Sequence, residues 1–87
     1  MFEKTKIAVT IPVFNEESHI KDVIKAIPDY VDYIVIIDDF STDGTFNKLL
    51  RINDDRVFIL RHKKNQGVGK STIDGHLFGV FLGADIL

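Results

Sequence analysis

The stretch VDYIVIIDD, residues 31–39, is the part of the chain that decides the fold. Its apolar residues are nearly continuous up to the two aspartates at its end. Such a run is typical of a parallel strand that is covered on both faces of its sheet, because neither side of the strand meets water. We therefore expect a buried strand here that ends at Asp38 and Asp39.

Two further strands are expected on either side of this one in the sequence. The segment KIAVTIPVF is rich in β-branched residues and predicts a strand over residues 6–11 that stops at Pro12. The segment RVFILRH, residues 56–62, predicts the third strand. The chain thus offers three strands separated by longer segments.

Helical spacing of apolar residues follows each expected strand. In residues 15–28 we expect Asn15 to be the N-cap and Pro28 to end the helix. The apolar positions of this helix are Ile20, Val23, Ile24 and Ile27. The second helix has Phe46, Leu49 and Leu50 on one face. The third, about residues 69–84, carries one amphipathic stripe formed by Ile73, Leu77, Val80, Phe81 and Ala84.

Three β-α units in succession predict an α/β fold with a parallel sheet and right-handed crossovers. The chain ends at ADIL, where a fourth strand would start, so we expect that strand to be absent or only begun. The third helix has Gly75, Gly79 and Gly83 at four-residue spacing. Each glycine costs about 1 kcal/mol in a helix, so we favour close packing against the sheet over a membrane dimerisation motif.

Composition limits the function classes. The chain has 87 residues, 45% hydrophobic and 28% charged, as in an ordinary globular domain, and we treat residues 1–87 as a single partial domain. A net charge of −2 argues against nucleic acid as a partner. No cysteine, secretory signal or apolar tract of membrane-spanning length is present, so we expect a cytoplasmic protein.

Ligands of open parallel sheets bind beyond the carboxyl ends of the strands, which makes the following loops the candidate site. After the first strand, Phe14 can stack on a base and Glu16 can accept from a ribose hydroxyl. Both residues also have structural alternatives, as a core or staple aromatic and as a helix-dipole carboxylate.

The two aspartates after residue 37 cannot act as one dyad, because neighbouring residues in a strand point to opposite sides. We expect Asp39 to face the cleft and Asp38 to bond nearby backbone amides. Ser41 and Asp43 are expected to be turn or cap residues.

The loop NQGVGKST, residues 65–72, partly matches a phosphate-binding P-loop. Lys64 stands where that motif needs its first glycine, which makes a P-loop nucleotide-binding protein the least favoured alternative. Lys63, Lys64 and Lys70 can meet phosphates or simply form a solvated charge cluster. His19, His62 and His76 lack the spacing of metal ligands.

Together, IPVFNEESHIKDVI, VDYIVIIDDFSTDGT and RVFILRHKKNQGVGKSTIDGHLFGVFLGADI resemble the opening half of a family 2 glycosyltransferase. The nearest branch is that of enzymes that transfer sugars to polyprenyl phosphates. The resemblance implies a GT-A fold, with a three-layer, Rossmann-like amino-terminal half that binds a UDP- or GDP-sugar. It also implies an inverting transferase, an acceptor such as polyprenyl phosphate, and possible membrane association of a full-length relative.

By this resemblance the nucleotide-binding residues are Pro12, Phe14, Glu16, Asp39 and Lys70. Phe14 stands where the family usually has tyrosine, and Phe40 replaces the usual glycine of DDGSTD. The Phe40 substitution raises the question of whether that turn keeps its backbone shape.

The resemblance also implies Mg²⁺ or Mn²⁺, bound through a D-x-D motif on the next strand, and a later general base. Neither is found in these 87 residues, so we assign no catalytic or metal-binding residue and expect no metal bound by this chain alone. The alternative function is a non-catalytic module that dimerises through an open sheet edge or by helix exchange.

Overall fold

The computed structural model describes residues 5–84. The elements in chain order are β1 (Ala8–Val13), α1 (Ile20–Lys25), β2 (Tyr33–Asp38), α2 (Thr45–Leu50), β3 (Val57–Arg61) and α3 (Val68–Phe81). The predicted alternation of strand and helix is confirmed over this range. The expected start of a fourth strand falls on residues 85–87, outside the part that is described.

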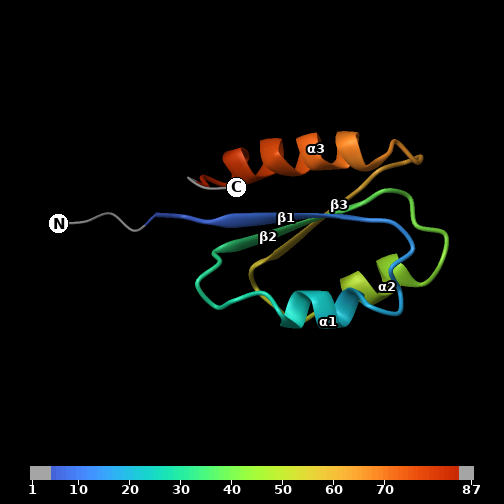
Figure 1. Cartoon of the computed structure of the whole chain (residues 1–87), viewed down its shortest axis with the longest axis horizontal. Helices are drawn as coiled ribbons and strands as arrows, with labels where there is room; N and C mark the ends of the chain where they lie inside the picture. Colours follow the sequence, from blue (N-terminus) through green and yellow to red (C-terminus); the bar gives the residue numbers. More distant parts are fainter. Residues whose placement is uncertain (1–4, 85–87) are drawn as a thin grey trace.

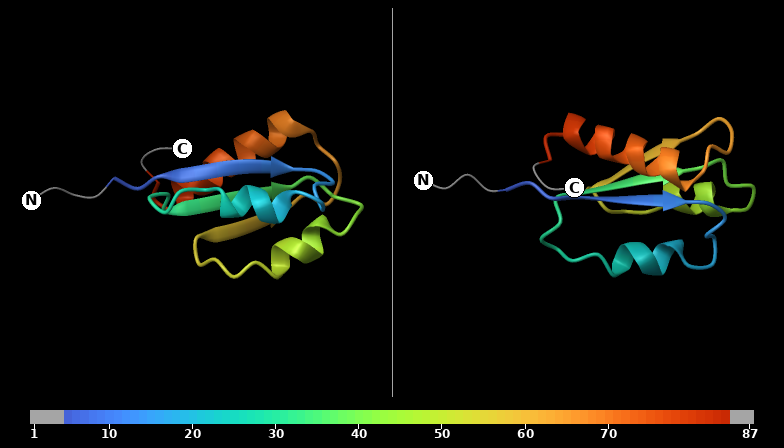
Figure 2. Two further views of the ribbon diagram at one scale, coloured as in Figure 1. Left: turned by 60° about the horizontal axis from the view of Figure 1, so that its bottom comes forward. Right: turned by 45° about the horizontal axis from the view of Figure 1, so that its top comes forward.

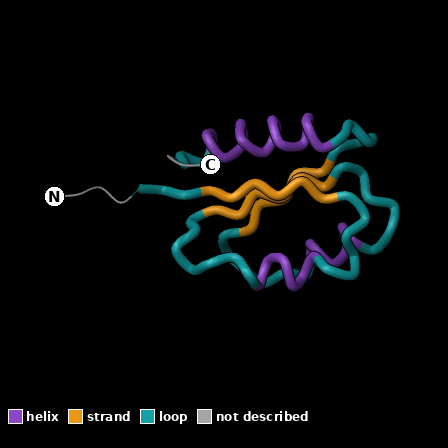
Figure 3. Tube along the Cα trace, in the orientation of Figure 1, coloured by secondary structure: helices purple, strands orange, loops and turns teal. Residues whose placement is uncertain are grey.

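The three strands form one parallel sheet in the order β1-β2-β3. One face of the sheet is covered by α3 and the other by α1 and α2, which gives three layers (Figures 1 and 2). The fold is therefore the expected Rossmann-like α/β arrangement. Figure 3 shows that the loops after the three strands gather at one end of the sheet, which we call the carboxyl edge.

The core explains why residues 31–39 decide the fold. Ile34, Val35, Ile36 and Ile37 in β2 have no exposed surface, because this strand lies between two others and under helices on both faces. Ile34 and Ile36 pack in the main core together with Val13, Ile20, Ile24, Val31 and Leu49. This cluster joins the sheet to α1 and α2.

Small residues line the contact between α3 and the sheet. Ser71, Gly75 and Gly79 are the buried residues of this helix. A Cβ placed on Gly75 would lie 2.0 Å from Thr10 Cγ2 and 3.3 Å from Ile37 Cγ1. Close packing was thus predicted correctly for Gly75, and Gly79 is buried in the same helix. For Gly83 the prediction was wrong, because this residue ends the helix instead.

The carboxyl end of α3 is a Schellman motif. Gly83 has a φ of 93°, a left-handed conformation that suits glycine. Its N–H donates to Val80 O at 2.9 Å, and Ala84 N–H donates to Gly79 O at 3.0 Å. These two bonds satisfy carbonyl groups that the helix itself leaves unpaired.

The apolar stripe of α3 faces away from the sheet. Four of its five members remain largely exposed: Ile73 57%, Leu77 65%, Val80 60% and Phe81 82%. The fifth, Ala84, is half-buried and follows the end of the helix. The inner face is occupied by the small residues of this helix and by Phe78, whose ring lies 6.0 Å from that of Phe58 in β3, so the stripe points outward. No helix among residues 5–84 is long and apolar enough to cross a membrane.

Several local expectations need correction. The first helix ends at Lys25 and not at Pro28, and Val23 is 43% exposed. The first strand does not stop at Pro12 but runs to Val13, since β1 is an edge strand and tolerates a residue that has no N–H. Asn15 is not the N-cap of α1, which begins at Ile20 after a turn in which Glu16 O accepts from His19 and Ile20. Leu50 is not on the buried face of α2, because 62% of it is exposed.

Candidate functional site

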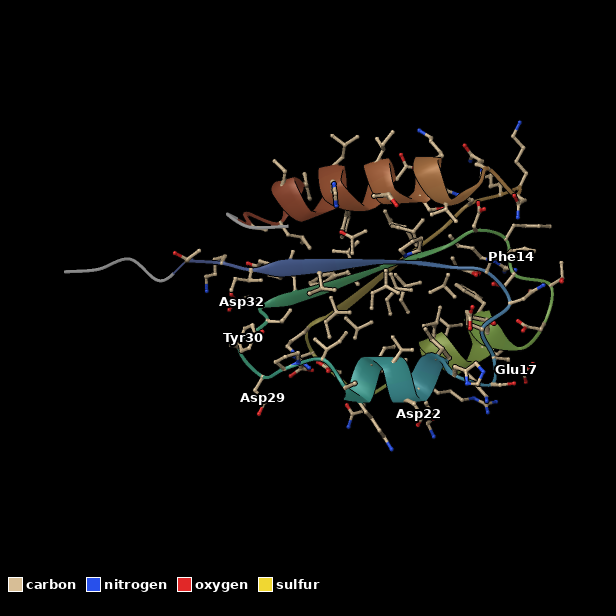
Figure 4. All side chains as sticks on the ribbon, in the orientation of Figure 1. Phe14, Glu17, Asp22, Asp29, Tyr30 and Asp32 are labelled. Atoms are coloured by element: carbon tan, nitrogen blue, oxygen red, sulfur yellow. The ribbon has the colours of Figure 1, made fainter. Side chains whose placement is uncertain are left out.

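Three loops form the carboxyl edge: loop 1 (residues 14–19), loop 2 (residues 39–44) and loop 3 (residues 62–67). Figure 4 shows Phe14 and Glu17 at this end of the sheet, with Asp29, Tyr30 and Asp32 at the opposite end. The candidate site is therefore where parallel sheets bind ligands.

Loop 1 is bonded to loop 2 through Asn15. Its backbone has a φ of 53°, which asparagine tolerates better than most residues. Its Oδ1 accepts from the N–H of Thr42 at 2.8 Å and of Asp43 at 3.3 Å, and its own N–H donates to Ser41 Oγ at 3.0 Å. Asn15 thus shapes loop 2 instead of capping a helix.

The two glutamates of loop 1 differ in their surroundings. Glu17 Oε1 accepts from Gly44 N–H at 2.9 Å, and its carbonyl oxygen accepts from Lys48 Nζ at 2.7 Å, so Glu17 is a structural residue. Glu16 donates its backbone N–H to Thr45 Oγ1 at 2.9 Å, while its side chain is exposed. Of the two carboxylates on this loop, only that of Glu16 is open to a ligand.

Asp38 is fully buried and holds loop 2 to β3. Its Oδ1 accepts from the backbone N–H of Ser41 at 3.3 Å and from the Ser41 hydroxyl, and its Oδ2 lies 3.1 Å from Arg61 Nε. Arg61 in turn lies over the ring of Phe46, 4.4 Å from its centroid. This agrees with the expectation that Asp38 bonds nearby backbone amides.

Asp39 lies on the other side of the strand end and connects loop 2 with loop 3. Only 4% of Asp39 is exposed. Its Oδ1 accepts from Gln66 N–H at 2.8 Å and faces His62 Nδ1 at 2.8 Å, and its Oδ2 accepts from Gly67 N–H at 2.8 Å. Since a carboxylate oxygen can accept two hydrogen bonds, Oδ2 keeps the capacity for one more donor.

His62 links Asp39 to α3. Its Nε2 lies 2.7 Å from Asp74 Oδ2, and Asp74 Oδ1 lies 3.0 Å from Lys70 Nζ. The hydrogen bond to Asp39, helped by the one to Asp74, raises the pKa of His62 although burial opposes this. The pKa of Asp74 is lowered, first by Lys70 and then by His62.

Burial alone would raise the pKa of Asp39 and is the largest single effect on it. The hydrogen bonds from His62, Gln66 and Gly67 together outweigh burial, so the pKa of Asp39 is lowered. Asp39 therefore stays ionised, and it can accept a hydrogen bond but cannot donate one.

The structure brings together three of the residues proposed from the sequence. Pro12, Phe14 and Asp39 line one hollow of about 30 Å³, with Val13, Val68 and Ser71. This volume is about that of one water molecule, so a larger ligand must rest over the hollow and not inside it. Phe14 is 45% exposed and offers its ring to such a ligand. Ser71 is fully buried, and its Oγ has no hydrogen-bond partner.

The other two proposed residues, Glu16 and Lys70, do not line this hollow. Lys70 is engaged with Asp74 one helical turn further on, and about half of its side chain is exposed. A larger groove of about 410 Å³ lies between α1 and α2 and includes Asp29, at the opposite end of the sheet. None of the five proposed residues lines that groove.

A divalent cation does not fit the described residues. Within residues 5–84 no cluster of three or more histidine, aspartate or glutamate side chains is placed to hold a metal ion. The two adjacent aspartates point to opposite sides of the strand end, and each already accepts hydrogen bonds from N–H donors. A metal ion therefore has no part in the chemistry that we derive for this chain.

The sequence reasoning missed His62 and Asp74. The signal for His62 lay in the strand register: Asp38 pairs with Arg61, so the next residues, Asp39 and His62, are neighbours at the carboxyl edge. Asp74 follows Lys70 by one helical turn, but only the placement of α3 shows that it reaches His62.

Comparison with known proteins gives one family match and two related proteins. The family model described as Glycosyl transferase family 2 matches residues 8–75, which include all three loops. A protein of Methanococcus voltae named UDP-N-acetylglucosamine--dolichyl-phosphate N-acetylglucosaminyltransferase is 34% identical over 95 aligned residues, covering 92% of this chain and 38% of that protein. An uncharacterised protein of Methanocaldococcus jannaschii is 36% identical over 78 residues, covering 83% of this chain and 33% of that protein. The chain thus spans about a third of the length of these relatives.

Proposed function

The chain belongs to glycosyl transferase family 2, and from this premise we propose that its carboxyl edge binds the nucleotide of a UDP- or GDP-linked sugar. The observation that carries the proposal is the single hollow lined by Pro12, Phe14 and Asp39. An exposed aromatic ring beside an ionised carboxylate is the pair of groups that a nucleobase requires, one for its face and one for its edge.

Phe14 would stack on the base, and Asp39 Oδ2 would accept a hydrogen bond from the base edge. Glu16, exposed on the same loop, would accept from a ribose hydroxyl. Lys70 can reach a phosphate only by leaving Asp74. A half-exposed pair of this kind is worth well under 1 kcal/mol, so an incoming anion can compete for the lysine.

The acceptor character of Asp39 predicts which bases bind. Uracil N3–H and guanine N1–H are ring donors, whereas cytosine N3 and adenine N1 are acceptors, so cytosine and adenine can offer this carboxylate only their exocyclic amino group. UDP and GDP should therefore bind, and CDP and ADP should bind at least about tenfold more weakly.

We also propose that the chain supplies the nucleotide-binding part of a longer, inverting sugar transferase. The name of the Methanococcus voltae relative states a UDP-N-acetylglucosamine donor and a dolichyl-phosphate acceptor. By analogy we propose a UDP-linked sugar as donor and a polyprenyl phosphate as acceptor. The transfer itself is assigned to a longer protein, because the 87 residues hold no D-x-D motif.

Calorimetric titration with UDP and GDP tests the binding proposal. Asp39→Asn should weaken binding at least about tenfold because the charged acceptor is lost, and Phe14→Ala should weaken it through lost stacking. Lys70→Ala should have a smaller effect than either. The proposal fails if the wild-type chain binds neither nucleotide, or if Asp39→Asn and Phe14→Ala both bind like the wild type. ATP hydrolysis that Lys70→Ala abolishes would support the P-loop alternative.

Self-association is the second candidate function, and the outward stripe of α3 favours it. Ile73, Leu77, Val80 and Phe81 form an exposed apolar face on the order of 500 Å², the size of patches that often mark contact surfaces. Two copies joined through this face would bury about 1,000 Å², near the lower bound for a specific interface. The sheet edge at β1 is a poorer route, because Pro12 cannot donate a hydrogen bond there.

Sedimentation equilibrium tests this second candidate. The wild-type chain should show a reversible dimer that Leu77→Gln or Phe81→Gln dissociates. Lys21→Gln, at an exposed position of α1 on the opposite face of the sheet, should leave the dimer intact. A wild-type chain that stays monomeric up to millimolar concentration rules the candidate out.

A further inference from the structure

One imidazole ring lies between two carboxylates. His62 Nδ1 is 2.8 Å from Asp39 Oδ1, and Nε2 is 2.7 Å from Asp74 Oδ2. An ionised carboxylate only accepts hydrogen bonds, so each ring nitrogen must donate. Only the doubly protonated imidazolium can do this, since a neutral ring would turn a lone pair toward one of the carboxylates.

The surroundings keep this arrangement in place. The side chains of His62 and Asp39 are 9% and 6% exposed, and that of Asp74 is 22% exposed. The charged groups that face the ring are Asp39 from the end of β2 and Asp74 from α3, with Lys70 behind Asp74. Arg61, the neighbour of His62 in β3, is directed to Asp38 on the other face of the sheet.

We propose that His62 is a positioning residue of the nucleotide site, whose imidazolium orients the Asp39 carboxylate and ties it to α3 through Asp74. This proposal rests on the proposed function of the carboxyl edge. The His62 and Gln66 bonds occupy Oδ1 of Asp39, which leaves the open position on Oδ2 for the ligand. His62 itself need not touch the nucleotide.

Loss of the ring proton breaks this arrangement. A neutral His62 can donate to Asp39 or to Asp74 but not to both, so the ring loses its bond either to the acceptor carboxylate or to Asp74 in the middle of α3. The pKa of His62 is raised above its ordinary 6.5 by these same two partners, so the ring keeps its proton to a higher pH than a free imidazole does and loses it as pH rises through the raised value. Nucleotide affinity should therefore fall as pH rises through the pKa of His62.

The first test needs no nucleotide. In the ligand-free chain, ring ¹⁵N and ¹³C chemical shifts should show both nitrogens of His62 protonated at pH 7. As pH rises, the backbone amide signals of Gln66 and Gly67 should shift with the same midpoint as the ring. Asp74→Asn should lower that midpoint, because one of the two carboxylates is neutralised. A neutral ring at pH 6, or loop amides that do not follow the ring, overturns the proposal.

The second test measures UDP affinity between pH 6 and pH 9. Wild-type affinity should fall by about fivefold or more across the His62 midpoint. The glutamine in His62→Gln can donate only from its one amide group and does not ionise. This variant should therefore show no fall in UDP affinity with pH, and at pH 6 it should bind UDP as weakly as the wild type does at pH 9. In Asp74→Asn the fall in UDP affinity should move to lower pH. The UDP phosphate ionises in the same way whichever variant is titrated, so its effect cancels when the variants are compared with the wild type.

His76→Gln is the matched control, since His76 is an exposed histidine of the same helix and should leave the pH profile unchanged. If His62→Gln fails to fold, Asp74→Asn still tests the proposal through the displaced midpoint. UDP binding with identical pH profiles in the wild type, His62→Gln and Asp74→Asn overturns the positioning role and leaves the proposed function intact. Absence of UDP and GDP binding to the wild type defeats the proposed function, while the loop amides still report on the link itself.

Discussion

Phe40 adopts a left-handed backbone conformation with a φ of 61° in the turn after β2. This conformation costs a non-glycine residue about 1–2 kcal/mol. The turn therefore keeps a glycine-type shape although a phenylalanine occupies the position. Contacts across the turn, such as Ser41 N–H to Asp38 and Arg61 over the Phe40 ring, hold it there.

We predict that Phe40→Gly is more stable than Phe40→Ala by about 1 kcal/mol. Both variants lose the aromatic contact with Arg61, so their difference isolates the cost of the left-handed backbone. Urea denaturation of the two variants measures it. Equal midpoints would mean that the turn relaxes once the ring is removed.

Part of the candidate site could be predicted from the sequence at the level of single residues. That Asp38 and Asp39 diverge follows from strand geometry alone, and the structure places them on opposite sides of the sheet. The hydrogen-bond partners of Asp39 could not be predicted in this way, because Gln66, Gly67 and His62 are more than 20 positions away in sequence. Such contacts depend on strand register, which local patterns do not encode.

At the scale of elements, α3 is held to the sheet by its small residues. We predict that Gly75→Ala destabilises the fold by about 1–3 kcal/mol, because the new methyl group meets Thr10 Cγ2 at 2.0 Å on a stiff β-branched side chain. Thr10→Ser removes that methyl and should restore part of the loss. Urea denaturation of the single and double variants measures both effects.

Gly69→Ala in the same helix is the matched control. Nothing lies within 4 Å of a Cβ placed there, so this substitution should be neutral or stabilising by up to about 1 kcal/mol. If both alanine variants destabilise the protein equally, steric contact with the sheet is not the reason for Gly75.

The order of the six elements could be predicted because strands and helices differ in apolar periodicity and length. Their ends could not, because tertiary contacts decide them. Asn15 is a good N-cap residue by type, yet it bonds Thr42 and Asp43 across the carboxyl edge, and α1 starts five residues later at Ile20. The direction in which the apolar stripe of α3 points could not be predicted either, since apolar periodicity shows that a helix has an apolar face but not what covers that face.

At the scale of the whole molecule, the linked groups Asp39, His62 and Asp74 should limit stability on both sides of neutrality. The pKa of His62 is raised above its ordinary 6.5, so its contribution is complete below that pH and is lost as pH rises through the raised value. The pKa values of the two aspartates are lowered from 3.8, so their contribution is complete above that pH and is lost as pH falls through the lowered values.

We therefore predict that the urea midpoint of the wild type is highest between about pH 4 and pH 6.5 and declines on either side. In His62→Gln the decline on the alkaline side should be smaller, because the group that loses its proton there is gone. If the urea midpoint of this variant declines at alkaline pH as much as that of the wild type, a group other than His62 causes the decline.

The loops of the carboxyl edge are bonded to one another as well as to the sheet. Asn15 and Glu17 bind loop 2, and Asp39 binds loop 3, so each loop holds the next. The surface proposed for the nucleotide is thus held by hydrogen bonds before any ligand arrives, and association should require little loss of conformational entropy. In hydrogen–deuterium exchange, the amides of Thr42, Gly44 and Gly67 should open together as one cooperative unit, and a nucleotide should slow that opening without changing which amides take part.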